Sequence, residues 1–343
     1  MAKVEVWNEL NDLRVDLNVT EEGTTISINY YCGTSKELTI PSTIGGIPVT
    51  AINNYAISSS DELTNIIISE GIISIGDCGF SNCENLNNII LPESITSIGD
   101  EAFRNCELLT SIKFPKNIVK IGDNAFKGCS KLTEFIVDVN NPAFTTNEGV
   151  LFDKKMTTLI KCPVGKKGEY TVPDSVVNIE DTAFHGCKDL KQITITSNVF
   201  CIDAIRDCEQ LTDIIVHEKN LEFTSIEGVL FDKKSHVLFQ YPRGRNNMEY
   251  TVPKGTIRIF DSAFLGCKKL ININLPEDLL SIEDCAFDEC EQLASLVLPT
   301  NLKHIGNYTF RNCPNLKSIS LSRNTKFGYK AFDGFSGQLI YRD

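Results

Sequence analysis

The chain has 343 residues and a formal net charge of −12, with 33 Lys and Arg against 45 Asp and Glu. Hydrophobic residues make up 42% of it and charged residues 23%, which excludes a disordered or a collagen-like protein. The acidic balance argues against nucleic acid as a partner, because binding phosphates requires a basic surface. No apolar segment approaches the roughly 20 residues that a membrane-spanning helix needs, so we expect no membrane insertion.

The first 36 residues predict a β-hairpin that caps one end of the fold. Two segments with alternating apolar residues, 13–17 and 25–30, flank a polar turn at 21–23. The segment before residue 17 contains no apolar stretch after its lysine, so it does not have the pattern of a signal peptide. We therefore expect either a cytoplasmic protein or a mature form whose leader has been removed.

An internal repeat spans residues 37–322 and decides the fold class. Its consensus is L-x-x-I-x-L-P-x-x-I-x-x-I-G-x-x-A-F-x-x-C, with a period of 23 residues. The alternation before the proline predicts a short strand, and the glycine after the last isoleucine, for example Gly122, is expected to permit a tight bend. One unit of this size cannot bury its apolar face alone, so stacked copies predict a solenoid dominated by β-structure.

The strand of each repeat can be followed along the chain by its last inward-facing residue. Most successive positions are separated by 23 residues. They predict about twelve turns whose strands form a parallel sheet. The positions are Ile40, Ile68, Leu91, Phe114, Val137, Val172, Ile195, Val216, Val252, Leu275, Leu298 and Leu321.

Two of the steps between strands are longer and contain matching insertions, at about residues 140–167 and 219–247. Both carry Glu-Gly-Val-Leu-Phe-Asp-Lys-Lys followed by a second apolar stretch, which predicts a β-hairpin around the Asp-Lys-Lys turn. A looped-out turn is expected at 44–48. Residues 323–343 are expected to form a C-terminal cap, because an open end would expose the core of a solenoid. The whole chain is therefore predicted to be a single domain.

Thirteen cysteines require an explanation, and eight of them occupy one equivalent position per turn. One interpretation is metal binding or redox chemistry, and the other is a buried ladder of free thiols. The chain has no Cys-x-x-Cys pair, and no histidine pair completes a zinc site. We favour the buried ladder and expect no cofactor and no metal, although neighbouring copies could also lie within disulfide distance. The eight are Cys83, Cys106, Cys129, Cys187, Cys208, Cys267, Cys290 and Cys313.

Catalytic motifs are missing from the sequence. The four histidines lie in different turns, and none belongs to a His-Glu-x-x-His motif. The chain contains neither G-x-S-x-G nor a glycine-rich phosphate loop. Because a solenoid face without convergent titratable groups lacks the ingredients of an active site, we expect no enzyme activity.

The repeat and the Glu-Gly-Val-Leu-Phe-Asp insertion together resemble the BspA-like class (type 5) of leucine-rich repeat proteins, over about residues 30–335. The resemblance implies a curved, right-handed solenoid of the α/β type, dominated by β, with a parallel sheet on its concave face. It also implies a virulence-associated, adhesin-like protein, secreted or on the cell surface, that binds host or matrix proteins. The alternative is an intracellular protein-interaction scaffold with the same fold, and in either case we expect a monomer.

The exposed face of the predicted sheet is the candidate binding surface. The residue before each last inward position should point outward, and these residues form a broken row of aliphatic side chains and threonines beside a polar row. Exposed apolar residues on a large sheet mark interaction sites, while plain β-propensity is the competing explanation. The candidate binding residues are Ile67, Ile90, Lys113, Ile136, Thr171, Thr194, Ile215, Thr251 and Val297.

Overall fold

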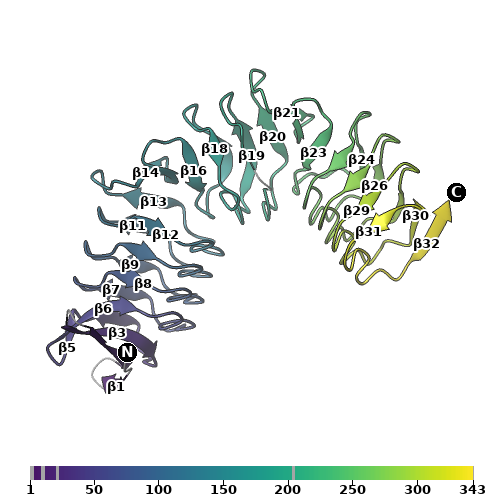
Figure 1. The fold of residues 1–343 in the computed structure, drawn as a ribbon. Coiled ribbons are helices and arrows are strands. Elements are labelled where there is room, and N and C mark those ends of the chain that lie inside the picture. Colours follow the sequence, from purple (N-terminus) through teal and green to yellow (C-terminus); the bar gives the residue numbers. More distant parts are fainter. Residues whose placement is uncertain (1–3, 9–11, 21–22, 203–204, 343) are drawn as a thin grey trace. The chain divides into compact units, whose positions relative to one another are not determined.

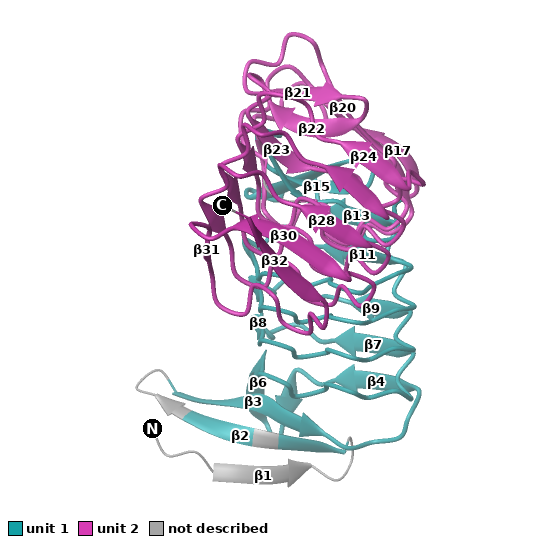
Figure 2. Cartoon of the chain, turned by 90° about the vertical axis from the view of Figure 1, so that its right-hand side faces the viewer, with its two compact units in different colours: residues 1–166 teal, residues 167–343 magenta. Residues whose placement is uncertain are grey.

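The computed structural model describes residues 4–8, 12–20, 23–202 and 205–342, which form strands and turns and contain no helix (Figure 1). The chain divides into two compact units, residues 1–166 (unit 1) and residues 167–343 (unit 2) (Figure 2). Each unit is a stack of similar turns, so the predicted β-dominated solenoid is confirmed. The sides of a turn that a helix could have occupied are built from turns and two-residue strands instead.

Every turn contains one strand of a parallel sheet that we call the long-strand row, visible as successive rungs in unit 1 (Figure 2). All twelve predicted strands are present in it. Among the described residues, pairing within the row is interrupted between β9 and β11 in unit 1, and between β20 and β24 and between β26 and β28 in unit 2. The row consists of β4 (Glu37–Ile40), β7 (Asn65–Ile68), β9 (Asn88–Ile90), β11 (Ser111–Phe114) and β13 (Glu134–Val137) in unit 1, and β17 (Gly168–Thr171), β19 (Leu190–Ile195), β20 (Asp213–Val216), β24 (Glu249–Thr251), β26 (Asn272–Asn274), β28 (Ser295–Val297), β30 (Ser318–Ser322) and β32 (Gln338–Arg342) in unit 2.

A second set of parallel strands, the short-strand row, follows the proline of each repeat. Most of its members have two residues, which is too short for an alternating pattern to predict a strand, so the sequence did not predict this row. The row consists of β6 (Ile47–Ile52), β8 (Ser74–Ile75), β10 (Ser97–Ile98), β12 (Lys120–Ile121) and β16 (Thr158–Lys161) in unit 1, and β18 (Asn178–Ile179), β23 (Val237–Gln240), β25 (Arg258–Ile259), β27 (Ser281–Ile282), β29 (His304–Ile305) and β31 (Lys326–Phe327) in unit 2.

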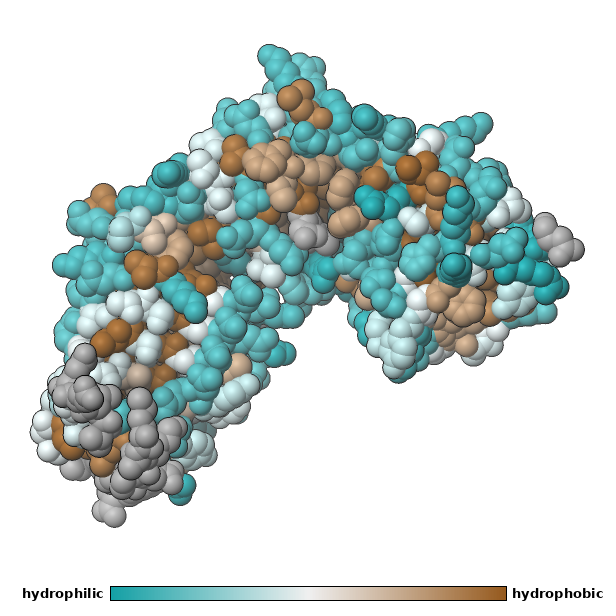
Figure 3. All heavy atoms as spheres, viewed as in Figure 1, coloured by the Kyte–Doolittle hydropathy of each residue, from teal (hydrophilic) through white to brown (hydrophobic). Residues whose placement is uncertain are grey.

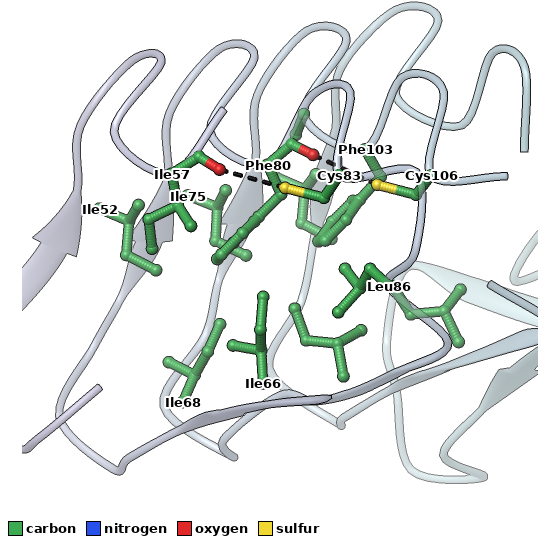
Figure 4. Close-up of a cluster of buried hydrophobic side chains, with 14 of the residues drawn as sticks. Ile52, Ile57, Ile66, Ile68, Ile75, Phe80, Cys83, Leu86, Phe103 and Cys106 are labelled. Atoms are coloured by element: carbon green, nitrogen blue, oxygen red, sulfur yellow. Dashed lines mark hydrogen bonds between the residues drawn. The ribbon is translucent and has the colours of Figure 1, made fainter. Parts of the chain in front are cut away.

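The Ala-Phe-x-x-Cys segment closes each turn and fills the core between the two rows (Figure 4). Its phenylalanine rings stack on those of the next turn. The centroids of Phe80 and Phe103 are 5.3 Å apart with an interplanar angle of 9°, and those of Phe287 and Phe310 are 5.6 Å apart with an angle of 8°. Aromatic pairs of this kind add about 0.5–1.5 kcal/mol beyond the area they bury. The repeat period thus fixes the stacking of one turn on the next.

The glycine of the repeat has a different role from the predicted bend. Gly122 does not adopt a positive φ. A Cβ atom there would lie 2.4 Å from the backbone nitrogen of Asp100 in the preceding turn. The Asp100 side chain in turn accepts a hydrogen bond of 2.9 Å from the backbone N–H of Asp123. Glycine is therefore required because neighbouring turns approach closely at this corner.

Each insertion is a three-stranded antiparallel meander rather than the single predicted hairpin. The Asp-Lys-Lys turn joins its second and third strands, as expected. An additional strand precedes them and is joined by a Glu-Gly turn in which both residues have positive φ, for example Glu148 (50°) and Gly149 (77°), as a type I′ hairpin requires. The strands are β14 (Phe144–Asn147), β15 (Val150–Asp153) and β16 (Thr158–Lys161) in unit 1, and β21 (Phe223–Ile226), β22 (Val229–Asp232) and β23 in unit 2.

A fully buried asparagine anchors each insertion to its unit. Asn141 donates from Nδ2 to the backbone oxygens of Pro115 (3.0 Å) and Ile118 (2.8 Å). Its Oδ1 accepts from two backbone N–H groups that begin the meander. Asn220 repeats the arrangement in unit 2, with two donated bonds of 2.8 Å. All four hydrogen-bonding positions of these buried amides are therefore satisfied, as burial demands.

The two ends of the chain extend the rows. The predicted strands 13–17 and 25–30 are β2 (Leu13–Thr20) and β3 (Gly23–Tyr31), which pair antiparallel, and β3 continues the short-strand row through β6. β1 (Val4–Asn8) pairs with β2, and β5 (Thr43–Ile44) pairs with β6 across the looped-out turn expected at 44–48.

Within residues 323–343, β31 and β32 add one more strand to each row. The solenoid has about fourteen turns rather than the predicted twelve. Residues 21 and 22 of the predicted polar turn lie outside the described residues, as does part of the segment tested for a signal peptide. The capping roles of 1–36 and 323–343, and the single domain, stay predictions.

Candidate interaction surface

The residues predicted to line the binding surface lie on the outward face of the long-strand row. In unit 1 the exposed fractions are 38% for Ile67, 50% for Ile90 and 40% for Ile136; in unit 2 they are 38% for Ile215 and 60% for Val297. The remaining candidates are also outside the core, and only Thr194 is half-buried. These are Lys113, Thr171, Thr194 and Thr251.

Strand register places the candidates beside one another as cross-strand neighbours. Ile67 pairs with Ile90 in unit 1, and Thr171, Thr194 and Ile215 follow one another in unit 2. The row continues beyond the predicted set to Ile340 on β32, which is 43% exposed and pairs with Ser320 on β30. Sequence reasoning missed Ile340 because it assigned residues 323–343 to a cap; the alternation in Gln338–Arg342 was the signal that could have identified it.

A polar row runs parallel to these residues, two positions earlier in each strand. It is partly ordered by amide hydrogen bonds between turns. Asn88 donates from Nδ2 to Oδ1 of Asn65 at 2.7 Å, and Asn272 donates to a carboxylate oxygen of Glu249 at 3.0 Å. The molecular surface in Figure 3 is largely hydrophilic, with apolar atoms breaking through in separate patches.

Two open hollows lie where pairing in the long-strand row is interrupted. The unit 1 hollow, between β9 and β11, has a volume of about 290 Å³. The unit 2 hollow, between β26 and β28, has a volume of about 380 Å³. The two are formed by equivalent residues of the repeat, since seven lining residues in unit 2 lie 184 positions after a lining residue in unit 1, as Asn272 does after Asn88.

The repeat cysteines line the core and not the surface. All thirteen cysteines are free thiols, and the eight repeat cysteines are buried. The Cys106 thiol donates to the backbone oxygen of Phe80 at 3.2 Å, and Cys83 donates to that of Ile57 at 3.1 Å (Figure 4). Burial raises the pKa of Cys83 to about 11 and that of Cys267 to about 12. A thiol held protonated in this way is a poor nucleophile and a poor metal ligand.

Three lysines of the insertions donate hydrogen bonds to backbone oxygens of their own insertion. Lys154 Nζ donates to the backbone oxygen of Val139 at 2.9 Å, and Lys233 Nζ does the same to that of Glu218. The ammonium of Lys166 donates to the backbone oxygen of Glu148. These contacts tie three of the insertion lysines to their own meanders.

Among the described residues, no group of three or more His, Cys, Asp or Glu side chains is arranged to hold a metal ion. His185 contacts Asp207 at 2.7 Å, and the second oxygen of that carboxylate accepts from Arg243 at 2.8 Å, so the three side chains form a hydrogen-bonded chain in unit 2. The described part of the chain includes no helix with the length and apolarity that a membrane crossing requires.

The sequence matches the family model of the BspA type leucine rich repeat region, in six copies, over residues 24–150, 166–238 and 238–340. The chain therefore belongs to the BspA-type leucine-rich repeat family. Among curated proteins, none matches the sequence at a significant level.

Several solved bacterial proteins have the same fold. A leucine rich cell surface protein from Faecalibacterium prausnitzii shares 19% identity at a TM-score of 0.56, over 100% of this chain and 96% of that one. The pneumococcal vaccine antigen PcpA shares 20% identity at a TM-score of 0.53, over 99% and 88%. A leucine-rich repeat protein from Eubacterium ventriosum shares 22% identity at a TM-score of 0.50, over 95% and 74%.

Proposed function

We propose that the protein is a non-enzymatic recognition protein that acts at the cell surface or after secretion, and that it binds host or matrix proteins through the outward face of the long-strand row. The family supports recognition, because leucine-rich repeat solenoids generally serve protein binding rather than catalysis. The location is supported by two proteins of similar fold, one called a cell surface protein and the other a vaccine antigen.

The observation that carries the proposal is the row of exposed aliphatic side chains on the sheet. Ile67, Ile90 and Ile136 present apolar surface to solvent at positions where polar residues would serve the fold equally well. Burying such side chains against a partner contributes about 25 cal/mol per Å² of apolar area. The adjacent polar row supplies amides and carboxylates for hydrogen bonds at the rim, which is the arrangement of protein interfaces.

The proposal is tested by capture of extracellular-matrix proteins on the immobilised protein. The double substitution Ile90→Asp with Ile136→Asp should leave the fold intact and weaken capture at least about tenfold, because it places two charges in the apolar contact. The matched control is Ile73→Asp with Val119→Asp, which changes two equally exposed aliphatic residues of unit 1 outside the long-strand row. Equal retention of partner by both double variants would count against the sheet face.

An intracellular scaffold with the same binding face is the second candidate. The thirteen free thiols favour it, because a cysteine-rich chain without disulfides suits a reducing compartment. The two candidates differ in where the chain resides. Labelling intact cells with a membrane-impermeant reagent should modify the protein if it is exposed at the surface, and labelling only after lysis would favour the scaffold.

A further inference from the structure

We infer that the unit 2 hollow is a subsite for a cationic side chain, lysine or arginine, of the protein bound by the sheet face. The inference rests on the proposed function and specifies the chemistry of its ligand. The hollow lies directly on that face, since Val297 of the exposed row forms part of its lining.

Two carboxylates give the hollow its charge. Glu249 comes from β24 and Glu277 follows β26, both are exposed, and no Lys or Arg is among the described residues that line the hollow. Each carboxylate is oriented by a neutral neighbour, Glu249 by the amide of Asn272 at 3.0 Å and Glu277 by the hydroxyl of Thr300 at 3.4 Å. A carboxylate has about four lone-pair sites, so both retain acceptors for a cation.

The rest of the lining matches the long stem of such a side chain. Val297 is 60% exposed, and the half-buried Leu275 also lines the hollow. Lysine and arginine bury their methylene groups against apolar surface while the charged end contacts acceptors. The Asn274 amide and the Ser295 hydroxyl add neutral acceptors, which suit the several N–H donors of a guanidinium or ammonium group.

The equivalent hollow in unit 1 contains a cation from the chain itself, Lys113. Lys113 takes the place of Val297, and Glu93 takes that of Glu277. The position equivalent to Glu249 is Asn65. The ionisable groups lining the unit 1 hollow therefore cancel, whereas those of the unit 2 hollow sum to two negative charges. Of the other five equivalent lining positions, four carry the same residue in both hollows, and Ile90 in unit 1 is replaced by Asn274 in unit 2.

Binding of a fluorescein-labelled peptide of four arginines flanked by glycines tests the subsite, with fluorescence anisotropy as the readout. Glu249→Gln with Glu277→Gln should weaken binding at least about fivefold. Glu84→Gln with Glu107→Gln removes the same charge from exposed sites outside the hollow and should change it less than about twofold. A matched peptide of four glutamates should not bind.

A second pair of variants tests the hollow without removing a carboxylate. Val297→Lys introduces the residue found in the unit 1 hollow and should weaken binding about as much as the double glutamine variant. Val119→Lys, at an exposed valine immediately before β12, is its matched control. The inference is overturned if the peptide does not bind, or if each variant and its control behave alike. Neither result bears on capture of matrix proteins through Ile90 and Ile136, which tests the proposed function separately.

Discussion

The sheet faces of the two units differ, although the turns beneath them are built alike. In unit 1 the outward row holds three isoleucines and one lysine between Ile67 and Ile136. In unit 2 the equivalent positions are mostly threonine, asparagine or serine, interrupted by Ile215, Val297 and Ile340. Below both faces, the phenylalanine stack, the cysteine hydrogen bonds and the close approach at the glycine recur from turn to turn.

The comparison separates what folding requires from what the surface is free to vary. An inward position must fit its counterparts in the adjacent turns, because packing is dense and each turn contacts mainly its neighbours. An outward position meets only solvent and its two cross-strand neighbours. Chemical variation between the units therefore concentrates on the outward face, which is where we place recognition.

The largest expected effect is loss of a buried asparagine. Asn141→Ala and Asn220→Ala each remove four hydrogen bonds and leave buried backbone groups unpaired, which should lower the free energy of unfolding by about 3 kcal/mol or more. Because the two insertions are built alike, the losses should agree within roughly 1 kcal/mol. Denaturant unfolding measures both, and Asn140→Ala, at an exposed neighbouring position, is the control. A large loss in one unit alone would break the equivalence of the insertions.

The repeat glycines should give the next largest effect. Gly122→Ala and Gly306→Ala place a Cβ atom 2.4 Å from a backbone nitrogen of the preceding turn, in unit 1 and unit 2 respectively. Overpacking of this kind costs about 1–3 kcal/mol, and backbone cannot move aside as a side chain can. Gly334→Ala, which has positive φ but open space around it, should cost only about 1 kcal/mol. If glycine were required there for a tight bend instead, thermal unfolding would show a larger loss of stability for Gly334→Ala than for Gly122→Ala and Gly306→Ala.

The buried thiols predict a stability that falls in alkali. The pKa of Cys129 and that of Cys267 are raised to about 12, so the native state keeps protons that the unfolded state loses near pH 9. The stabilisation of the folded state by these protonated thiols is complete below pH 9 and is lost as pH rises towards 12. At pH 10 the loss is about 1.4 kcal/mol per thiol.

Unfolding measured at pH 8 and pH 10 should therefore differ, and Cys267→Ala should reduce the difference. At pH 8, iodoacetamide should modify the exposed Cys32 and Cys201 before any repeat cysteine. Rapid modification of the repeat cysteines in either unit would contradict a buried, protonated ladder.

The smallest effect is expected on the exposed amide ladder. Asn88→Ala in unit 1 and Asn272→Ala in unit 2 each remove an exposed hydrogen bond to a neighbouring strand. Surface substitutions of this kind change stability by no more than about 0.5 kcal/mol. The difference between this small loss of unfolding free energy and the large loss expected for Asn141→Ala measures the effect of burial, because the residue type is the same. A loss above 2 kcal/mol in denaturant unfolding would show that the outward face is under structural constraint.

The long-strand row and the insertions were predictable because their patterns are local. Alternation before the proline identifies β11, and the duplicated Asp-Lys-Lys turn identifies β15 and β16. The short-strand row was not predictable, since two residues such as Ser97 and Ile98 carry no period. The Glu148–Gly149 turn was overlooked although its positive φ values follow a known hairpin chemistry.

The candidate site was only partly predictable. Outward positions follow from the period of a strand, which is why Ile90 and Ile136 could be named in advance. The buried roles of Asn141 and Asn220 could not, because asparagine in a loop normally signals a turn. The hollows depend on where strand pairing breaks between β26 and β28, and nothing in the repeat sequence marks that position.

The central claim is that recognition occurs on the outward face of the long-strand row. A photo-crosslinking residue placed at position 90, on that row, or at position 119, immediately before β12, tests it most directly when the protein is mixed with a panel of extracellular-matrix proteins. Both native side chains are about half exposed, 50% for Ile90 and 52% for Val119, so accessibility does not distinguish them. The account predicts adducts from position 90 and few from position 119. Adducts from position 119 alone, or none from position 90 with any protein of the panel, would contradict it.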